Sequence, residues 1–159
     1  MLTINIICIG KIKENFFKDS ISEYSKRLSK YCKLKIIELN DEKIPDKSNS
    51  NIDNSIKEKE SNCILNAIPK DSFTIALDLN GTSLSSTQFS EKIQDISMQK
   101  SSISFIIGGS LGLSQTLLNS VNYKICFSNM TFPHQLIRIF LLEQIYRGFK
   151  IANNETYHK

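Results

Sequence analysis

Short hydrophobic runs alternate with longer amphipathic stretches along the chain, and this alternation limits the folds that it can adopt. Runs rich in β-branched residues, typical of buried strands, occupy residues 2–9, 34–39, 73–79, 103–107 and 123–127. Apolar side chains recur at helical spacing over residues 15–31, 52–68, about 85–99 and 134–151, with a further short helix expected from about Ser114. Strands alternating with helices predict an α/β fold, a mostly parallel sheet flanked by helices on both faces.

The chain has the size of one domain. It has 159 residues, of which 40% are hydrophobic, so a single domain over residues 1–159 can bury a core. Asn80-Gly81 predicts a turn that ends the third strand, and Ser85 with Gln88 predicts a capping box that begins a helix. The polar residues 40–51 are expected to form a mobile loop.

Membrane, secreted and zinc-binding proteins do not fit this composition. No apolar run approaches the roughly 20 residues needed to cross a bilayer. The N-terminal MLTINIICIGK has no basic segment before its apolar run, so we expect a first strand and not a signal peptide. The four cysteines form no CxxC pair and no Cys/His ligand spacing. We therefore expect a cytoplasmic protein with no membrane association, no metal and no disulfide framework.

Positive charge gathers near the N-terminus. Between Lys11 and Lys35 there are eight basic and three acidic residues, whereas the whole chain carries a net charge of only +4. Such a segment attracts a polyanion through phosphate contacts and counterion release, although a solvated helix face is the plainer alternative. Residues 101–137 contain a single charged side chain, Lys124, which suits a buried site made of backbone groups.

A glycine-rich turn follows the fourth strand directly. Gly108-Gly109-Ser110-Leu111-Gly112 lets the backbone approach a ligand, but it is neither GxGxxG nor a P-loop, and a tight turn alone would also explain it. Ligands in open parallel sheets bind beyond the carboxyl ends of the strands. The loops after Leu79, at 108–112 and at 128–133 are therefore the candidate binding segments.

The C-terminal region holds both histidines and an unusual helix. His134 begins the last helix, where the helix dipole favours the neutral imidazole, and His158 lies in the terminal tail. Between Leu136 and Leu142 every residue except Arg138 is apolar. A helix that is apolar almost all round needs burial on more than one side, which a second copy of the chain or deep burial in one subunit would provide.

Four motifs in order carry a resemblance to a known family. They are the turn at 108–112, the run Phe127-Ser128-Asn129-Met130-Thr131-Phe132-Pro133-His134-Gln135, the sequence Glu143-Gln144-x-Tyr146-Arg147 and the terminal Tyr157-His158-Lys159. Together they resemble the bacterial ribosomal large-subunit RNA methyltransferase family H, small members of the SPOUT superfamily. The resemblance covers the whole chain, including Gly10-Lys11 after the first strand.

The resemblance implies an activity, a fold and an assembly. Members of this family transfer a methyl group from S-adenosylmethionine to N3 of a pseudouridine in 23S rRNA, acting on assembled ribosomes. Their C-terminal part is threaded into a deep trefoil knot, which general topology rules would not predict. They are homodimers with the knot region at the interface, in agreement with the apolar last helix of this chain.

The resemblance also implies the cofactor residues. By motif these are Leu77 at the end of a strand, Gly108 in the glycine turn, and the segment Phe127, Ser128, Asn129, Met130, Thr131 and Phe132. Leu111 and Asn129 depart from residues common in relatives. Because the contacts of this region are expected to be mostly backbone contacts, cofactor binding should survive both changes, while Asn129 could weaken an RNA contact.

RNA contacts and catalysis are expected from other residues. Arg138 and Lys159 would stabilise negative charge on the ring carbonyls, and Tyr157 would stack on the unpaired base. His158 is the candidate general base, although positioning alone could supply most of the rate. Phosphate contacts are expected from Lys26, Arg27 and Lys30.

Two other functions remain open from the residues alone. The chain could be a non-enzymatic RNA-binding module in which the glycine turn is structural. It could also be a flavodoxin-like binder of a nucleotide or phosphate that uses residues 108–112. Binding of S-adenosylmethionine would separate the methyltransferase from the first of these.

Overall fold

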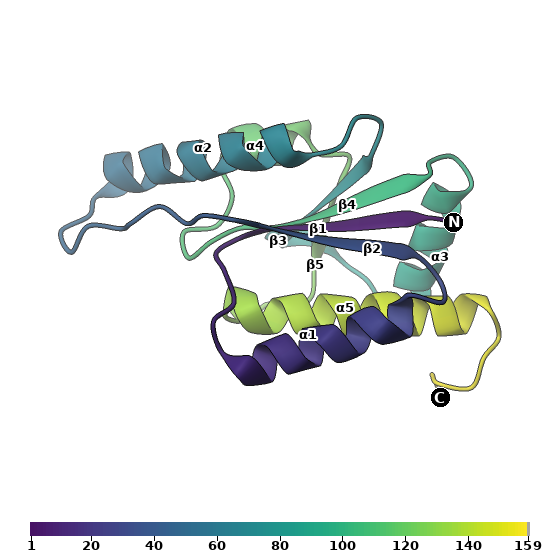
Figure 1. Cartoon of the computed structure of the whole chain (residues 1–159). Helices are drawn as coiled ribbons and strands as arrows, with labels where there is room; N and C mark the ends of the chain where they lie inside the picture. The colour runs from purple at the N-terminus through teal and green to yellow at the C-terminus, as the bar shows by residue number, and fades with distance from the viewer. Residues whose placement is uncertain (159) are drawn as a thin grey trace.

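A five-stranded parallel sheet lies between two layers of helices in the computed structural model, which describes residues 1–158 (Figure 1). The strands follow the order β2-β1-β4-β3-β5, and every adjacent pair is parallel. Their bounds are β1 (Thr3–Ile9), β2 (Lys33–Leu39), β3 (Phe73–Ser83), β4 (Ser102–Ile107) and β5 (Tyr123–Cys126). The helices are α1 (Asn15–Leu28), α2 (Ser50–Ala67), α3 (Ser86–Ser97), α4 (Gln115–Ser120) and α5 (His134–Ala152). The predicted α/β fold is confirmed.

Each face of the sheet has its own helix layer. Helices α2 and α4 cover one face, and α1, α3 and α5 cover the other (Figure 1). Successive strand residues supply the two cores: Ile6 packs on the side of α5, whereas Ile7 packs on the side of α2. This alternation follows from the two-residue period of a strand, and it explains why strands buried on both faces read as continuous apolar runs.

Most helix and strand boundaries predicted from local sequence signals lie within a few residues of the observed boundaries. The capping box of α3 is present: the Ser85 hydroxyl accepts from the Gln88 N–H at 3.2 Å, and the Gln88 side chain accepts from the Ser85 N–H at 2.9 Å. Helix α2 begins two residues before the predicted start, because the Asn49 side chain accepts from the N–H groups of Asn51 and Ile52. Within residues 1–158, no helix has the length and apolar character needed to span a bilayer.

The turn predicted at Asn80-Gly81 is wrong, because β3 continues to Ser83. Both Leu77 and Thr82 are in register with Ile125, with a shift between them. The ladder between β3 and β5 is therefore irregular, and residues 78–81 form the irregularity in β3. The trefoil knot stays a prediction.

Gly81 is needed where β3 passes β5. A Cβ atom at this position would lie 2.6 Å from the carbonyl carbon and 2.7 Å from the nitrogen of Ile125, and backbone atoms cannot move aside cheaply. We predict that Gly81→Ala lowers the free energy of unfolding by about 1–3 kcal/mol, as overpacking typically does. Chemical denaturation followed by circular dichroism measures the loss.

Gly148→Ala is the matched control for this prediction. A Cβ at Gly148 would meet Ser90 at 3.6 Å, an ordinary contact, and alanine favours a helix by about 1 kcal/mol over glycine. Its stability should therefore stay near or above that of the wild type. Equal stability of Gly81→Ala and the wild type would contradict the tight passage around Ile125.

Candidate cofactor and RNA site

Three of the candidate segments leave neighbouring strands at one edge of the sheet. Ala76 of β3 is in register with Ile106 of β4, and Leu77 is in register with Ile125 of β5. Gly108 and Phe127 each follow two residues after these partners. The cofactor residues predicted from separate motifs therefore meet at the carboxyl edge, where parallel sheets bind ligands.

The glycine turn after β4 is closed by its own backbone. The Gly112 N–H donates to the Gly109 carbonyl at 3.0 Å, and Gly112 has a φ of +82°. A Cβ at Gly108 would lie 2.9 Å from the Gly112 carbonyl carbon. Gly108 is thus required for the turn itself, because a side chain there would collide with the backbone of Gly112.

A buried carboxylate of α2 lies against this turn. Glu60 is 5% exposed, and burial raises the pKa of its carboxyl group. One carboxylate oxygen accepts from the Glu42 N–H at 3.0 Å, and the other lies 3.1 Å from the place that a Cβ of Gly109 would occupy. Glu60 therefore connects the segment between β2 and α2 to the glycine turn.

The segment after β5 has few hydrogen bonds of its own. Within the described chain, residues 128–132 make no hydrogen bond to other backbone groups. The Met130 N–H donates to the Ser128 hydroxyl at 3.0 Å, and the Ser128 carbonyl accepts from the Cys126 thiol at 3.1 Å. The other backbone N–H and C=O groups of this segment match the donors and acceptors on the edge of an adenine ring. The residues present thus fit an adenosine-containing cofactor.

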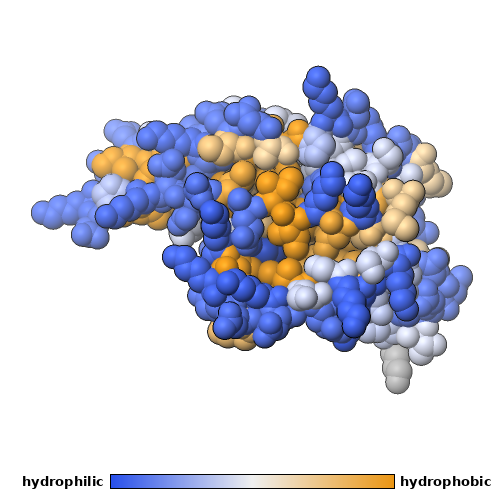
Figure 2. Space-filling model, in the orientation of Figure 1, coloured by the Kyte–Doolittle hydropathy of each residue, from blue (hydrophilic) through white to orange (hydrophobic). Residues whose placement is uncertain are grey.

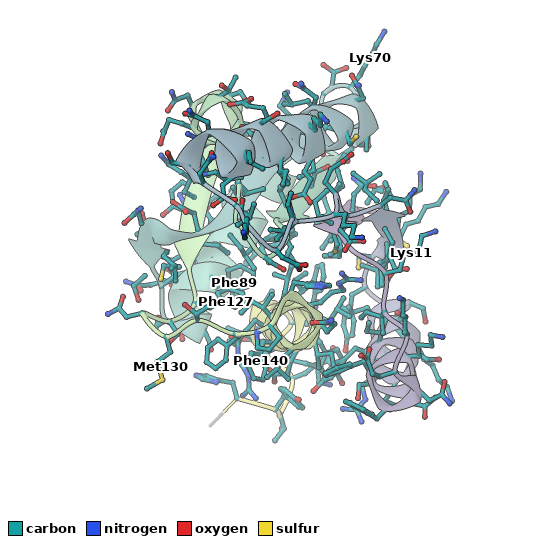
Figure 3. All side chains as sticks on the ribbon, turned by 90° about the vertical axis from the view of Figure 1, so that its left-hand side faces the viewer. Lys11, Lys70, Phe89, Phe127, Met130 and Phe140 are labelled. Carbon is teal, nitrogen blue, oxygen red and sulfur yellow. The ribbon has the colours of Figure 1, made fainter. Side chains whose placement is uncertain are left out.

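A cavity of about 450 Å³ adjoins this segment. Phe127, Ser128 and Phe132 line it, whereas Leu77 and Gly108 do not. Its other walls come from the end of β5, from the start of α3 with the two residues before it, and from the middle of α5, namely Leu84, Ser85, Ser86, Phe89, Ile125, Cys126, Phe140, Glu143 and Gln144. Phe89, Phe127 and Phe140 gather beside α5, and Met130 lies at the outer side of the segment (Figure 3).

Arg138 is fully buried, which corrects its expected contact with RNA. Its guanidinium donates to Glu38 at 2.6 Å and to the Gly10 carbonyl at 3.1 Å, and it lies 3.2 Å from Nδ1 of His134. A guanidinium held by three protein groups and 0% exposed has no surface to offer to RNA. Arg138 instead ties α5 to the ends of β1 and β2.

His134 is held in its neutral form by its surroundings. Burial lowers its pKa first, and the neighbouring Arg138 cation lowers it further. The imidazole lies directly on Gly10, where a Cβ atom would come within 2.8 Å of the ring. The neutral state predicted from the helix terminus is confirmed, with burial as its main cause.

The C-terminal tail folds back along α5. The Tyr157 ring lies 5.0 Å from that of Tyr146, its hydroxyl donates to Glu143 at 3.2 Å, and Arg147 lies over it at 4.7 Å. His158 is exposed, with Nδ1 3.3 Å from the Arg147 guanidinium. Glu143 lines the cavity beside Phe127, so the tail lies near its rim. Lys159 lies outside the described residues.

The basic segment is exposed on and after α1. Lys26 and Lys30 point to solvent, and Arg27 pairs with Glu23 at 2.8 Å. The Arg27 guanidinium also lies over the rings of Tyr24 and Tyr146, at 5.5 and 5.8 Å. These placements leave the three cations accessible to phosphates.

A family model described as "Predicted SPOUT methyltransferase" matches residues 2–158. The chain belongs to the SPOUT methyltransferase family. Proteins named "Ribosomal RNA large subunit methyltransferase H" are 58% identical in Clostridium botulinum (strain Hall), 55% in Clostridium tetani and 53% in Clostridium acetobutylicum, over 99% of this chain and 100% of each relative. A solved structure, a probable methylase family protein from Haemophilus influenzae Rd KW20, shares the fold. Its TM-score is 0.53 at 14% identity, over 98% of this chain and 70% of that one.

Two polar residues of this SPOUT methyltransferase were not predicted from its sequence. Glu60 stands in a helix whose other charged residues are half-buried or exposed, and Glu38 stands in the edge strand β2, so neither position shows a motif. The one sequence signal for these two residues is their position. Each is an acidic residue where the spacing of apolar residues predicts a buried site or a strand edge. Within residues 1–158, no group of three or more His, Cys, Asp or Glu side chains is arranged to hold a metal ion.

The lowered pKa of His134 predicts how stability depends on pH. The unfolded chain takes up a proton near the ordinary pKa of 6.5, whereas the folded protein does so only at lower pH. The contribution of His134 is therefore complete above about pH 6.5 and is lost as the pH falls towards the folded pKa. Denaturation of wild type and His134→Gln across this range should show a steeper loss in the wild type. Parallel curves would contradict the buried neutral state.

Proposed function

We propose that this chain transfers a methyl group from S-adenosylmethionine to N3 of a pseudouridine in 23S rRNA, on assembled ribosomes in the bacterial cytoplasm. The observation that carries the proposal is the meeting of the glycine turn and the unpaired backbone of residues 128–132 at one edge of the sheet. The names of relatives that match over their whole length support the substrate class.

The cofactor would be held mostly by backbone groups. Leu77 would contact the adenine, Gly108 would allow close approach at the glycine turn, and residues 127–132 would wrap the adenosine and methionine parts. When bound, S-adenosylmethionine supplies an electrophilic methyl group on its sulfonium sulfur. The protein must then hold the uracil N3 in line with the departing sulfur and exclude water from the site.

The tail would complete the site for the RNA base. In this structure the Arg147 guanidinium lies 3.3 Å from Nδ1 of His158. His158 would leave this contact and accept the N3 proton at the freed ring nitrogen. Tyr157 would stack on the splayed base, and Lys159 would stabilise negative charge on its carbonyls. Lys26, Arg27 and Lys30 would contact rRNA phosphates.

The active unit would be a homodimer formed along α5. Helices α1 and α3 cover the flanks of α5, but Phe140 stays 39% exposed at the wall of the large cavity, 5.4 Å from the Phe132 ring. A second copy seated on this side would cover the aromatic surface and bring its own tail near the cavity.

Calorimetry with S-adenosylmethionine and a methyl-transfer assay on ribosomes that lack the modification test the proposed function. Micromolar cofactor binding and incorporation of one methyl group into 23S rRNA are the expected results. Ribosome binding without cofactor binding would instead favour the RNA-binding module. Affinity for inorganic phosphate without affinity for the cofactor would favour the phosphate binder.

We predict that removal of residues 157–159 lowers methyl transfer by orders of magnitude and leaves cofactor affinity unchanged. His158→Ala should cost roughly 10²–10⁴-fold if His158 is the base. The melting temperature should fall only slightly, since the tail makes few apolar contacts beyond the Tyr157 ring. Tyr157→Phe, which keeps the ring, is the control for packing. Full activity of the truncated protein would exclude the tail from catalysis.

We predict that Phe140→Asp converts a dimer to monomers, because a carboxylate would be buried without a partner at the contact. Phe16→Asp is the matched control, since Phe16 is 64% exposed on α1. Leu141 is unsuitable, because it is fully buried in the core of one subunit. Sedimentation at micromolar concentration measures the change, and a monomeric wild type would rule out the dimer.

A further inference from the structure

A second cavity, of about 350 Å³, lies away from the carboxyl edge. It is formed where the C-terminal parts of α1, α3 and α5 come together, and its walls are Lys30, Tyr31, Ser90, Ile93, Gln94, Ser97, Gly148, Phe149, Ala152 and Asn153. These helix ends lie near the start of β1, whereas the candidate cofactor segments follow the strand ends at the opposite edge (Figure 1). The cavity is therefore separate from the proposed methyl-transfer site.

Aromatic rings form one wall of this cavity. Tyr31 and Phe149 are stacked, with ring centroids 5.5 Å apart and planes 9° from parallel. Tyr146 meets the edge of Tyr31 at 6.0 Å, which holds the pair in place. A rigid aromatic wall of this kind binds flat ring systems, and RNA bases are recognised on such surfaces.

Two side-chain amides line the same space, those of Gln94 and Asn153. The Asn153 side-chain N–H donates to the Phe149 carbonyl at 2.8 Å, and the Gln94 side-chain N–H donates to the Ser90 hydroxyl at 3.3 Å. Among residues 1–158, none donates a hydrogen bond to the oxygen of either amide. Amides beside aromatic rings suit a base that carries hydrogen-bond donors and acceptors.

The rim of the cavity is positively charged. Lys30 lines it, Lys26 and Arg27 precede it on α1, and no acidic side chain is among its walls. The carboxylate of Glu155 is held by the Lys150 ammonium and by the Tyr31 hydroxyl at 3.0 Å, and it is close enough to Lys30 to feel its charge. No salt bridge within 4.0 Å joins Lys30 to a carboxylate of the described residues, so its ammonium can meet a phosphate at this rim.

We infer that this cavity is a second RNA subsite, which binds one unpaired nucleotide of the substrate RNA outside the methylation site. Its base lies against Tyr31 and Phe149, and its phosphate lies at Lys30. The inference rests on the proposed function for the identity of the partner as RNA. A free mononucleotide has the same chemistry, so the test separates the two sources.

The test uses the full-length protein and a short labelled single-stranded RNA, with a hairpin of equal length for comparison. Lys30→Glu should weaken single-strand binding and reduce the salt slope of log K by about 0.7, the value for one lost phosphate contact. Ala152→Leu, which fills the cavity without changing charge, should weaken it roughly tenfold through lost stacking and leave the slope unchanged.

Lys70→Glu is the matched control for charge. Lys70 is exposed beyond α2, on the far side of the molecule from α5 (Figure 3). The Lys70→Glu variant should bind the single-stranded RNA with the affinity and the salt slope of the wild type. Photo-cross-linking of the bound RNA should map to Tyr31 or Phe149, and the hairpin should bind more weakly than the single strand.

Two outcomes overturn the inference, each in a distinct way. Wild-type affinity of Ala152→Leu would show that surface charge alone binds RNA. Tight binding of adenosine monophosphate without binding of the single strand would assign the cavity to a free nucleotide. If the cavity is a separate site, these variants should bind S-adenosylmethionine with the affinity of the wild type, as measured by calorimetry. Failure of the wild type to bind that cofactor would overturn the proposed function and leave the RNA result standing.

Discussion

One buried arginine determines how the carboxyl edge of the sheet meets the last helix. The Arg138 side chain of α5 is 0% exposed and joins Glu38 of β2, the Gly10 carbonyl after β1 and the ring of His134. Removing a guanidinium from water is costly, and here hydrogen bonds to an anion and a carbonyl offset that cost. Because the cation cannot leave without losing them, the start of α5 is held in one place. The position of the candidate cofactor segment, which leads into α5, is fixed with it.

The surface above this cluster shows where the protein remains open. Apolar side chains are visible between the layer of α2 and the layer of α1, over the outer strands of the sheet (Figure 2). Lys33 and Lys35 of β2 are exposed beside them, and charges of this kind discourage another strand from pairing with a sheet edge. The exposed edge of the sheet is thus protected by charge, although apolar side chains lie close to it.

Local sequence patterns predicted the helices and strands. The features that they did not predict depend on contacts between residues far apart in the sequence. Alternating burial at Ile6 and Ile7 and the capping box at Ser85 depend on near neighbours, so both could be read from the sequence. Glu38, the partner of Arg138, stands 100 residues away in the sequence. Because the sequence does not show this pairing, the arginine was predicted to contact RNA. Asn80-Gly81 has the composition of a turn, yet β3 continues through both residues and stays packed against β5. The candidate cofactor segments came from a resemblance, since periodicity alone shows no ligand.

Helix α5 connects the two ends of the site. Its first turn is tied to the sheet by Arg138, while further along, Glu143 accepts from Arg147 at 2.6 Å and from the Tyr157 hydroxyl at 3.2 Å. Glu143 also lines the large cavity beside Phe127. Under the proposed function Tyr157 would move onto an RNA base, and this carboxylate would then lose one donor at the cavity wall. The position of the tail and the polarity of the cavity would then be coupled through a single side chain, on a helix whose opposite end is fixed.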